Sequence, residues 1–126
     1  MDLGLAGKTV VVTAATANIG RGIALEMSYG PSDEKLAALT GHLAPGSFLL
    51  ELAKLAGIAT PRPAAAMTEA DALALARRRA PSFKDCPVIV IHVKALSYDA
   101  VKREVAALKA AGLNLILPEQ GESYRF

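Results

Sequence analysis

The stretch from Pro87 to Lys94, PVIVIHVK, constrains the fold more than any other part of the chain. Its β-branched run from Val88 to Ile91 favours a strand buried on both faces, which is typical of a parallel sheet. In such sheets, functional sites lie just beyond the carboxyl ends of the strands. His92 follows this strand directly and is therefore a candidate metal ligand or proton carrier. Taken alone, a histidine at such a position is more often a hydrogen-bonded structural residue.

Length and composition limit the classes of protein to which the chain can belong. Its 126 residues are enough for one core, so we expect a single domain over residues 1–126. A net charge of +2 and only 5% aromatic residues do not favour nucleic acid as a partner. The single cysteine, Cys86, excludes an internal disulfide and favours a reducing, cytoplasmic compartment. No apolar run of about 18 residues occurs, so no membrane span is expected.

Local patterns predict further strands and helices around the central strand. Apolar runs predict strands at Thr9–Thr13, Leu113–Leu117 and Ser123–Phe126, whereas Ile23–Tyr29 fits either a strand or a helix. Helices are predicted at 33–39, from a Ser47 cap to Gly57, at 68–79 with a Thr68–Asp71 capping box, and at 98–111. A linker is predicted at 59–67. The strand-helix-strand order predicts the α/β class, with a right-handed crossover in a parallel sheet.

Three consecutive arginines, Arg77 to Arg79, end the predicted helix at 68–79. Cations at a helix C-terminus interact favourably with the helix dipole. We interpret this run as a solvated helix end rather than as a grip for phosphate.

The first 25 residues, MDLGLAGKTVVVTAATANIGRGIAL, resemble the opening of a short-chain dehydrogenase/reductase. That family has a T-G-x-x-x-G-x-G turn, where a helix N-terminus receives the cofactor pyrophosphate. Here the turn is TAATANIG, with Ala14 and Asn18 in place of two glycines and only Gly20 retained. The resemblance implies a short Rossmann-like βα opening. Because no Y-x-x-x-K pair follows, a nicotinamide enzyme is not expected, and a nucleotide-binding fragment is kept as an alternative.

Residues 26–126 resemble the carboxyl half of a class II 3',5'-cyclic-nucleotide phosphodiesterase, a hydrolase with the metallo-β-lactamase fold. The resemblance lies in LEMSYGP, GHLAP, PVIVIHVK and LNLILPEQGESYRF, which occur in the order of that family. It implies a partial metallo-β-lactamase-like sandwich, that is, one αβ half, following the Rossmann-like opening. It also implies an enzyme that hydrolyses a cyclic nucleotide at a two-metal centre, with zinc or another divalent metal as cofactor.

The same resemblance assigns roles to three residues. His92 takes the role of the last metal-binding histidine on its strand. His42, in GHLAP, takes the role of the loop histidine that assists departure of the leaving oxygen, which protonation by a nearby acid makes easier. Glu26 matches an acidic position that orients the site or hydrogen-bonds to it without binding the metal itself.

The family supplies most of its metal ligands from an H-x-H-x-D-H motif in its amino-terminal half. This chain has two histidines and no H-x-H, so we expect it to bind zinc weakly or not at all and to hydrolyse no cyclic nucleotide alone. The join near Ile23–Met27 indicates a truncated or chimeric chain. A sheet without its partner half exposes apolar surface, so we expect self-association or binding of a missing amino-terminal half. A noncatalytic interaction module is the remaining alternative.

Overall fold

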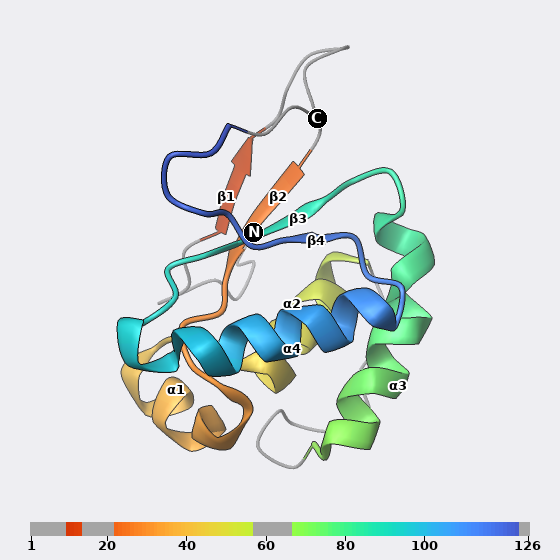
Figure 1. Ribbon diagram of the computed structural model, residues 1–126. Helices are drawn as coiled ribbons and strands as arrows, with labels where there is room; N and C mark the ends of the chain where they lie inside the picture. The colour runs from red at the N-terminus through yellow and green to blue at the C-terminus, as the bar shows by residue number, and fades with distance from the viewer. Residues whose placement is uncertain (1–9, 14–21, 57–66, 124–126) are drawn as a thin grey trace, which may run out of the picture.

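The computed structural model describes residues 10–13, 22–56 and 67–123 (Figure 1). Over these residues the protein belongs to the α/β class. The strands are β1 (Val10–Thr13), β2 (Gly22–Glu26), β3 (Val88–Ile91) and β4 (Leu115–Ile116). The α-helices are α1 (Glu34–Thr40), α2 (Pro45–Leu55), α3 (Glu69–Arg79) and α4 (Tyr98–Ala110). Short 3-10 helices lie at η1 (Pro31–Asp33), η3 (Ala80–Phe83) and η4 (Ala95–Ser97).

The strands form one four-stranded sheet in the order β1-β2-β3-β4. β2, β3 and β4 are parallel, and β1 pairs antiparallel with β2 at the edge. Leu25 lies opposite Val90, and Val88 lies opposite Leu115. The predicted central strand is therefore an interior strand. The stretch Ile23–Tyr29, for which strand and helix were both open, contributes a strand that ends at Glu26.

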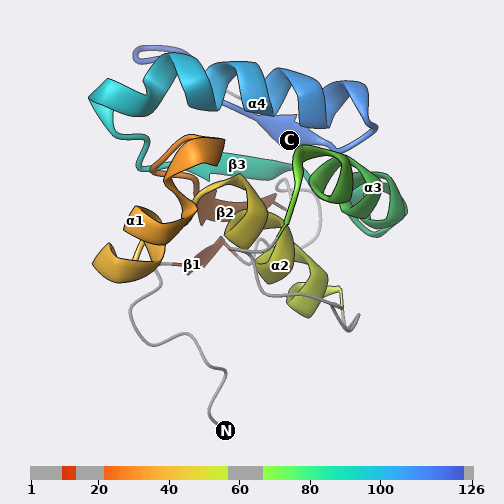
Figure 2. The same cartoon turned by 90° about the horizontal axis from the view of Figure 1, so that it is seen from below.

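The helices lie below the sheet in Figure 1, and Figure 2 shows the molecule from that side. In β3, Val88 and Val90 are buried in the core, whereas Ile89 and Ile91 are only partly buried. The prediction that this strand is buried on both faces is therefore wrong, because the described helices cover one face. The core joins that face to apolar stripes of the helices, namely Leu25, Val88, Val90, Leu115, Phe48, Leu49, Leu52, Leu75, Ala76, Val101, Val105 and Leu108.

Helix starts differ in how well local sequence predicts them. For α3 the capping box is confirmed, because the Asp71 N–H donates to the Thr68 hydroxyl at 3.2 Å and the Thr68 N–H donates to the Asp71 carboxylate at 3.1 Å. For α2 the predicted cap is wrong, because the helix begins at Pro45 and Ser47 lies in its first turn. Proline is well suited to a first turn because that turn needs no backbone donor. The Ser47 hydroxyl instead accepts the Ala44 N–H at 2.9 Å.

The arginine run at the end of α3 is not uniformly solvated. Arg77 and Arg78 are exposed, as predicted, but Arg79 is 1% exposed. Among the residues that the structure describes, its Nε and Nη2 atoms have no hydrogen-bond partner. Arg79 follows Ala72, Leu75 and Ala76 at helical spacing on the face of α3 that packs into the core, which is why the interpretation as a solvated helix end fails for this residue.

Some predictions lie outside the described residues. These include the turn that follows Thr13, most of the 59–67 linker, and residues 124–126 of the last predicted strand. In the described part of the chain, no single helix is long and apolar enough to cross a membrane. The segment Pro31–Thr40 and α2 pass that test of length and composition only as a pair, and they are bent by 70° relative to one another.

Candidate functional site

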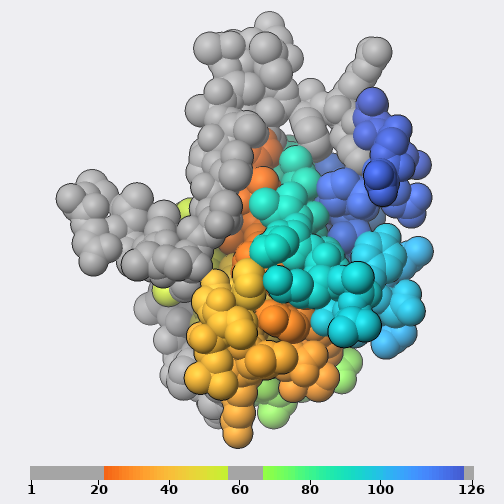
Figure 3. Space-filling model, turned by 90° about the vertical axis from the view of Figure 1, so that its left-hand side faces the viewer, coloured from red at the N-terminus to blue at the C-terminus, as the bar shows by residue number. Residues whose placement is uncertain are grey.

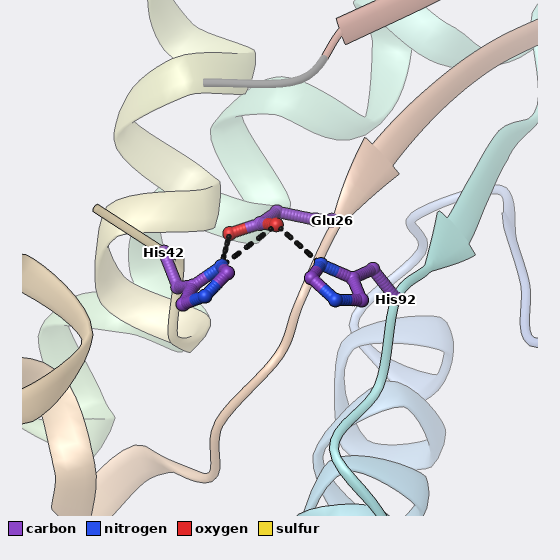
Figure 4. A group of neighbouring side chains, drawn as sticks. All are labelled: Glu26, His42 and His92. Carbon is purple, nitrogen blue, oxygen red and sulfur yellow. Dashed lines mark hydrogen bonds and ion pairs between the residues drawn. The ribbon is translucent and has the colours of Figure 1, made fainter. Parts of the chain in front are cut away.

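Glu26, His42 and His92 meet at the carboxyl edge of the parallel strands (Figure 4). Glu26 is the last residue of β2 and lies opposite Ile91, after which His92 follows directly. His42 comes from the loop between α1 and α2. Figure 3 shows this α1–α2 region beside the segment that follows β3, on one face of the molecule. The cluster therefore lies at the edge where functional sites of parallel sheets are expected.

Backbone hydrogen bonds hold both histidine-bearing loops against the continuation of β2. The Met27 N–H donates to the Ile91 carbonyl at 3.2 Å, which extends the pairing of β2 with β3. The Ser28 N–H donates to the Leu43 carbonyl at 2.9 Å, and the Lys94 N–H donates to the Ser28 carbonyl at 3.0 Å. The segment after Glu26 thus bridges the two loops.

The end of α1 turns the chain back so that His42 faces the sheet. Gly41 has a φ of 71°, a left-handed conformation that glycine adopts without the steric penalty of a side chain. The His42 N–H then donates to the Ala37 carbonyl at 2.8 Å. The glycine of GHLAP therefore has a geometric role in presenting His42.

The Glu26 carboxylate is the centre of the cluster. His42 Nδ1 lies 3.1 Å from Oε1 and 3.2 Å from Oε2, and His92 Nδ1 lies 3.0 Å from Oε2 (Figure 4). The Leu43 N–H donates to Oε1 at 2.7 Å. The Glu26 side chain is 4% exposed, whereas those of His42 and His92 are 22% and 53% exposed. A buried carboxylate thus supports two histidines that reach solvent.

The protonation state of Glu26 determines whether the two histidine nitrogens beside it donate or accept hydrogen bonds. Burial acts to raise the pKa of Glu26, but hydrogen bonds from His92, His42 and Leu43, together with electrostatic attraction to His42, lower it below its ordinary value. Glu26 is therefore ionised at neutral pH and can only accept hydrogen bonds. A ring nitrogen that hydrogen-bonds to this carboxylate therefore acts as the donor, as Nδ1 of each histidine is placed to do.

His92 has an unusual backbone conformation. Its φ is 57°, and it is the non-glycine residue with positive φ among those that the structure describes. Such left-handed conformations are uncommon outside glycine and persist where surrounding contacts hold them. In this conformation the ring points toward Glu26 (Figure 4). The sequence carries no signal for this conformation.

Edge-to-face ring contacts further restrict His42. Its ring centroid lies 5.1 Å from that of His92 and 5.9 Å from that of Tyr29. Such aromatic pairs stabilise a particular relative orientation. Tyr29 was not identified as a site residue, although it lies in the LEMSYGP stretch that contains Glu26.

The donor atoms of the cluster suit a small divalent cation. One ligand atom from each of Glu26, His42 and His92 lies within 4.8 Å of the others. Two imidazoles and a carboxylate are a common zinc ligand set. Strand pairing and the Gly41 turn bring Glu26 and His42 to His92, although nothing in their sequence spacing indicates it. Asp85 and Cys86 precede β3 and are not part of this cluster.

A separate cleft of about 350 Å³ lies among the four α-helices. Charged residues in its lining include Glu34, Glu69, Arg103 and Glu104, but no residue of the cluster lines it. Burial raises the pKa of Glu104, and the nearby Glu69 charge adds to this effect. The cleft and the cluster are therefore different features of the molecule.

No family model, curated protein or solved structure matches the chain. The geometry of the cluster, together with the sequence resemblance, is therefore the basis on which a function can be proposed.

Proposed function

We propose that the chain provides one half of a metal-dependent phosphodiesterase centre of the class II cyclic-nucleotide type. In this proposal His92 is a metal ligand, His42 is a proton donor, and Glu26 orients both. The observation that supports it most is the carboxylate shared by the two Nδ1 atoms, at 3.0 to 3.2 Å. The two layers of sheet and helices would then be one αβ half of a metallo-β-lactamase-like sandwich.

His92 suits the role of ligand because its second ring nitrogen is available. With the Nδ1 proton donated to Glu26, the lone pair on Nε2 is free for a metal ion, and the side chain is 53% exposed. A carboxylate behind a histidine ligand also fixes the orientation of the ring. Bound zinc would lower the pKa of a water molecule and polarise the phosphoryl group.

His42 suits the role of general acid because its Nδ1 atom lies against the Glu26 carboxylate, which fixes the ring. The Nδ1–carboxylate distance of 3.1 Å allows Glu26 to bind the protonated ring, whose Nε2–H then remains available to a substrate. An alkoxide is a poor leaving group, so a proton from His42 Nε2 would allow the ester oxygen of a cyclic nucleotide to leave as a hydroxyl group.

The site is incomplete as a two-metal centre because such a centre needs more ligands than these residues provide. The chain lacks an H-x-H-x-D-H motif. We therefore propose that the isolated chain binds zinc weakly and hydrolyses no cyclic nucleotide. The remaining ligands would have to come from residues outside this stretch of sequence. Chelator-sensitive turnover of cyclic AMP by the purified chain alone would contradict this incompleteness.

Calorimetric titration with zinc tests the proposed metal role. We expect weak binding at one site in the wild-type chain and no binding in His92→Ala. Glu26→Gln should weaken binding about 10- to 100-fold, as is usual for a residue that orients a ligand. Cys86→Ser removes the only thiol and should leave the affinity unchanged. Unchanged binding in His92→Ala, or no binding by the wild type, would overturn the proposal, and complete loss in Glu26→Gln would make Glu26 a direct ligand.

A second candidate function, that of a noncatalytic interaction module, is favoured by the other face of the sheet. Ala24, Ile89, Ile91 and Ile116 share this face by strand alternation and are partly exposed. Apolar strands of this kind can bind a partner or a second copy of the chain. Light scattering over a range of concentrations should show self-association, and a monomer at high concentration would count against it.

The alternative of a nucleotide-binding fragment rests on TAATANIG, and we expect no binding of nicotinamide cofactors.

A further inference from the structure

We infer that Ser28 is a positioning residue, whose hydroxyl holds His92 in the left-handed conformation that turns its ring toward Glu26. This inference rests on the proposed role of His92 and extends it to Ser28, which lies in the LEMSYGP stretch but to which the sequence assigned no role. Ser28 does not belong to the group of possible ligands, and it would act only through His92.

The contacts of the Ser28 side chain are directed at His92. Ser28 is 0% exposed, and its hydroxyl donates to the His92 carbonyl at 2.8 Å. The same Oγ atom lies 3.5 Å from His92 Nδ1. Because the hydroxyl proton goes to the carbonyl, Oγ can act toward the ring nitrogen only as an acceptor. One buried side chain thus contacts both the backbone and the ring of His92.

Strand alternation explains why Ser28 and Glu26 act on the same histidine. The segment after β2 continues the pairing with β3 through the hydrogen bond from Met27 to Ile91. Residues two apart in an extended segment point to the same side, so Glu26 and Ser28 face the cluster while Met27 points into the core. Glu26 therefore binds the His92 ring, and Ser28 binds the backbone that carries it.

The backbone of His92 needs such support because of its φ of 57°. A left-handed conformation in a residue other than glycine persists where neighbouring contacts determine it. Ser28 supplies two of these contacts, because its hydroxyl binds the His92 carbonyl and its own carbonyl accepts the Lys94 N–H at 3.0 Å. Removing the hydroxyl leaves the Lys94 contact in place but frees the His92 carbonyl.

Ser28→Ala tests the inference by two independent measurements on the full chain. Long-range proton–nitrogen NMR of the metal-free protein reports the tautomer of His92, which we expect to change from the Nδ1–H form in the wild type to a mixture. Zinc affinity should fall about 10- to 100-fold. Ser97→Ala is the matched control, because Ser97 is also buried, at 8% exposed, but makes no side-chain capping hydrogen bond. It should change neither measurement.

The outcomes separate this inference from the proposed function. A wild-type chain that binds no zinc would contradict the proposed function, while the tautomer of His92 would still report on Ser28. A folded Ser28→Ala protein with wild-type His92 signals would overturn the inference. If Ser28→Ala does not fold, Ser28→Cys retains a side chain of similar shape with a weaker donor. A partial shift of the His92 signals in that variant would support the inference, and unchanged signals would overturn it.

Discussion

Glu26 and Arg79 are both charged residues buried in the protein, at 3% and 1% exposure, yet their surroundings differ sharply. Glu26 accepts hydrogen bonds from two histidine rings and one backbone N–H. Two guanidinium nitrogens of Arg79 have no hydrogen-bond partner within the described part of the chain. Burying a charge costs several kcal/mol unless it is paired and hydrogen-bonded. Glu26 therefore has hydrogen-bond partners that offset the cost of its burial, whereas the described residues offer none to these two nitrogens of Arg79.

The comparison also shows that burial of a charge does not by itself identify a functional site. Arg79 is buried because helical spacing places it on the same face as Leu75 and Ala76. Glu26 is buried because the loop that carries His42 and Leu43 closes over the end of β2. The cluster differs from Arg79 because hydrogen-bond donors from separate elements meet at one acceptor, the Glu26 carboxylate.

The largest expected change in stability follows from removing Glu26, the buried charge that has hydrogen-bond partners. Glu26→Ala leaves the Leu43 N–H and two ring N–H groups without their acceptor, so the free energy of unfolding should fall by about 2–4 kcal/mol in urea titrations. Lys102→Ala, on the exposed surface of α4, is the control and should change stability by less than about 0.5 kcal/mol. A loss as small as that of the control would mean that Glu26 is no better compensated than Arg79.

Removing the buried charge of Arg79 is expected to change the free energy of unfolding in the opposite direction. Arg79→Met keeps most of the side-chain volume and removes the unpaired donors, so the free energy of unfolding should rise by about 1–3 kcal/mol. Arg78→Met changes an exposed neighbour and should have an effect within about 0.5 kcal/mol of zero. If Arg79→Met is destabilising in the same urea titration, the guanidinium has a favourable partner and the contrast with Glu26 disappears.

The stabilising effect of Glu26 should depend on pH. Its pKa is lower in the folded protein, so its contribution to stability is complete above the unfolded-state pKa of about 4.3 and is lost as the pH falls through the folded pKa. The difference in unfolding free energy between wild type and Glu26→Gln should therefore shrink on acidification below that value. A difference that is constant with pH would show that the charge of Glu26 does not matter.

The smallest change in stability is expected at Glu104, where ionisation acts in the opposite direction to that of Glu26. Burial and Glu69 raise the pKa of Glu104, so its ionised form disfavours folding at neutral pH. Glu104→Gln should stabilise the protein slightly at neutral pH, and this gain should vanish as the pH falls through the folded pKa to the unfolded one. Urea titrations at matched pH values measure both carboxyl groups in the same way, and a gain that persists in acid would contradict the assigned cause.

Local sequence was sufficient for features that depend on neighbouring residues. The β-branched run of β3, the Thr68–Asp71 capping box and the end of α4 before Gly112 are examples, because each depends on contacts within a few positions. The helical spacing of Ala72, Leu75, Ala76 and Arg79 was also visible. The burial of Arg79 also depends on the packing of α3 against α2, which cannot be read from the local sequence.

The candidate site divides in the same way between sequence and tertiary structure. The sequence alone indicates that one histidine follows an apolar strand, that another follows a glycine, and that Glu26 lies in an apolar segment that fits either a strand or a helix. Their meeting depends on the folded chain, because residues 16 and 66 positions from Glu26 are brought to its carboxylate by a loop and by parallel pairing. The left-handed backbone conformation of His92 also depends on tertiary structure. Contacts from Ser28, distant in sequence, hold this conformation, which is unfavourable for a residue other than glycine.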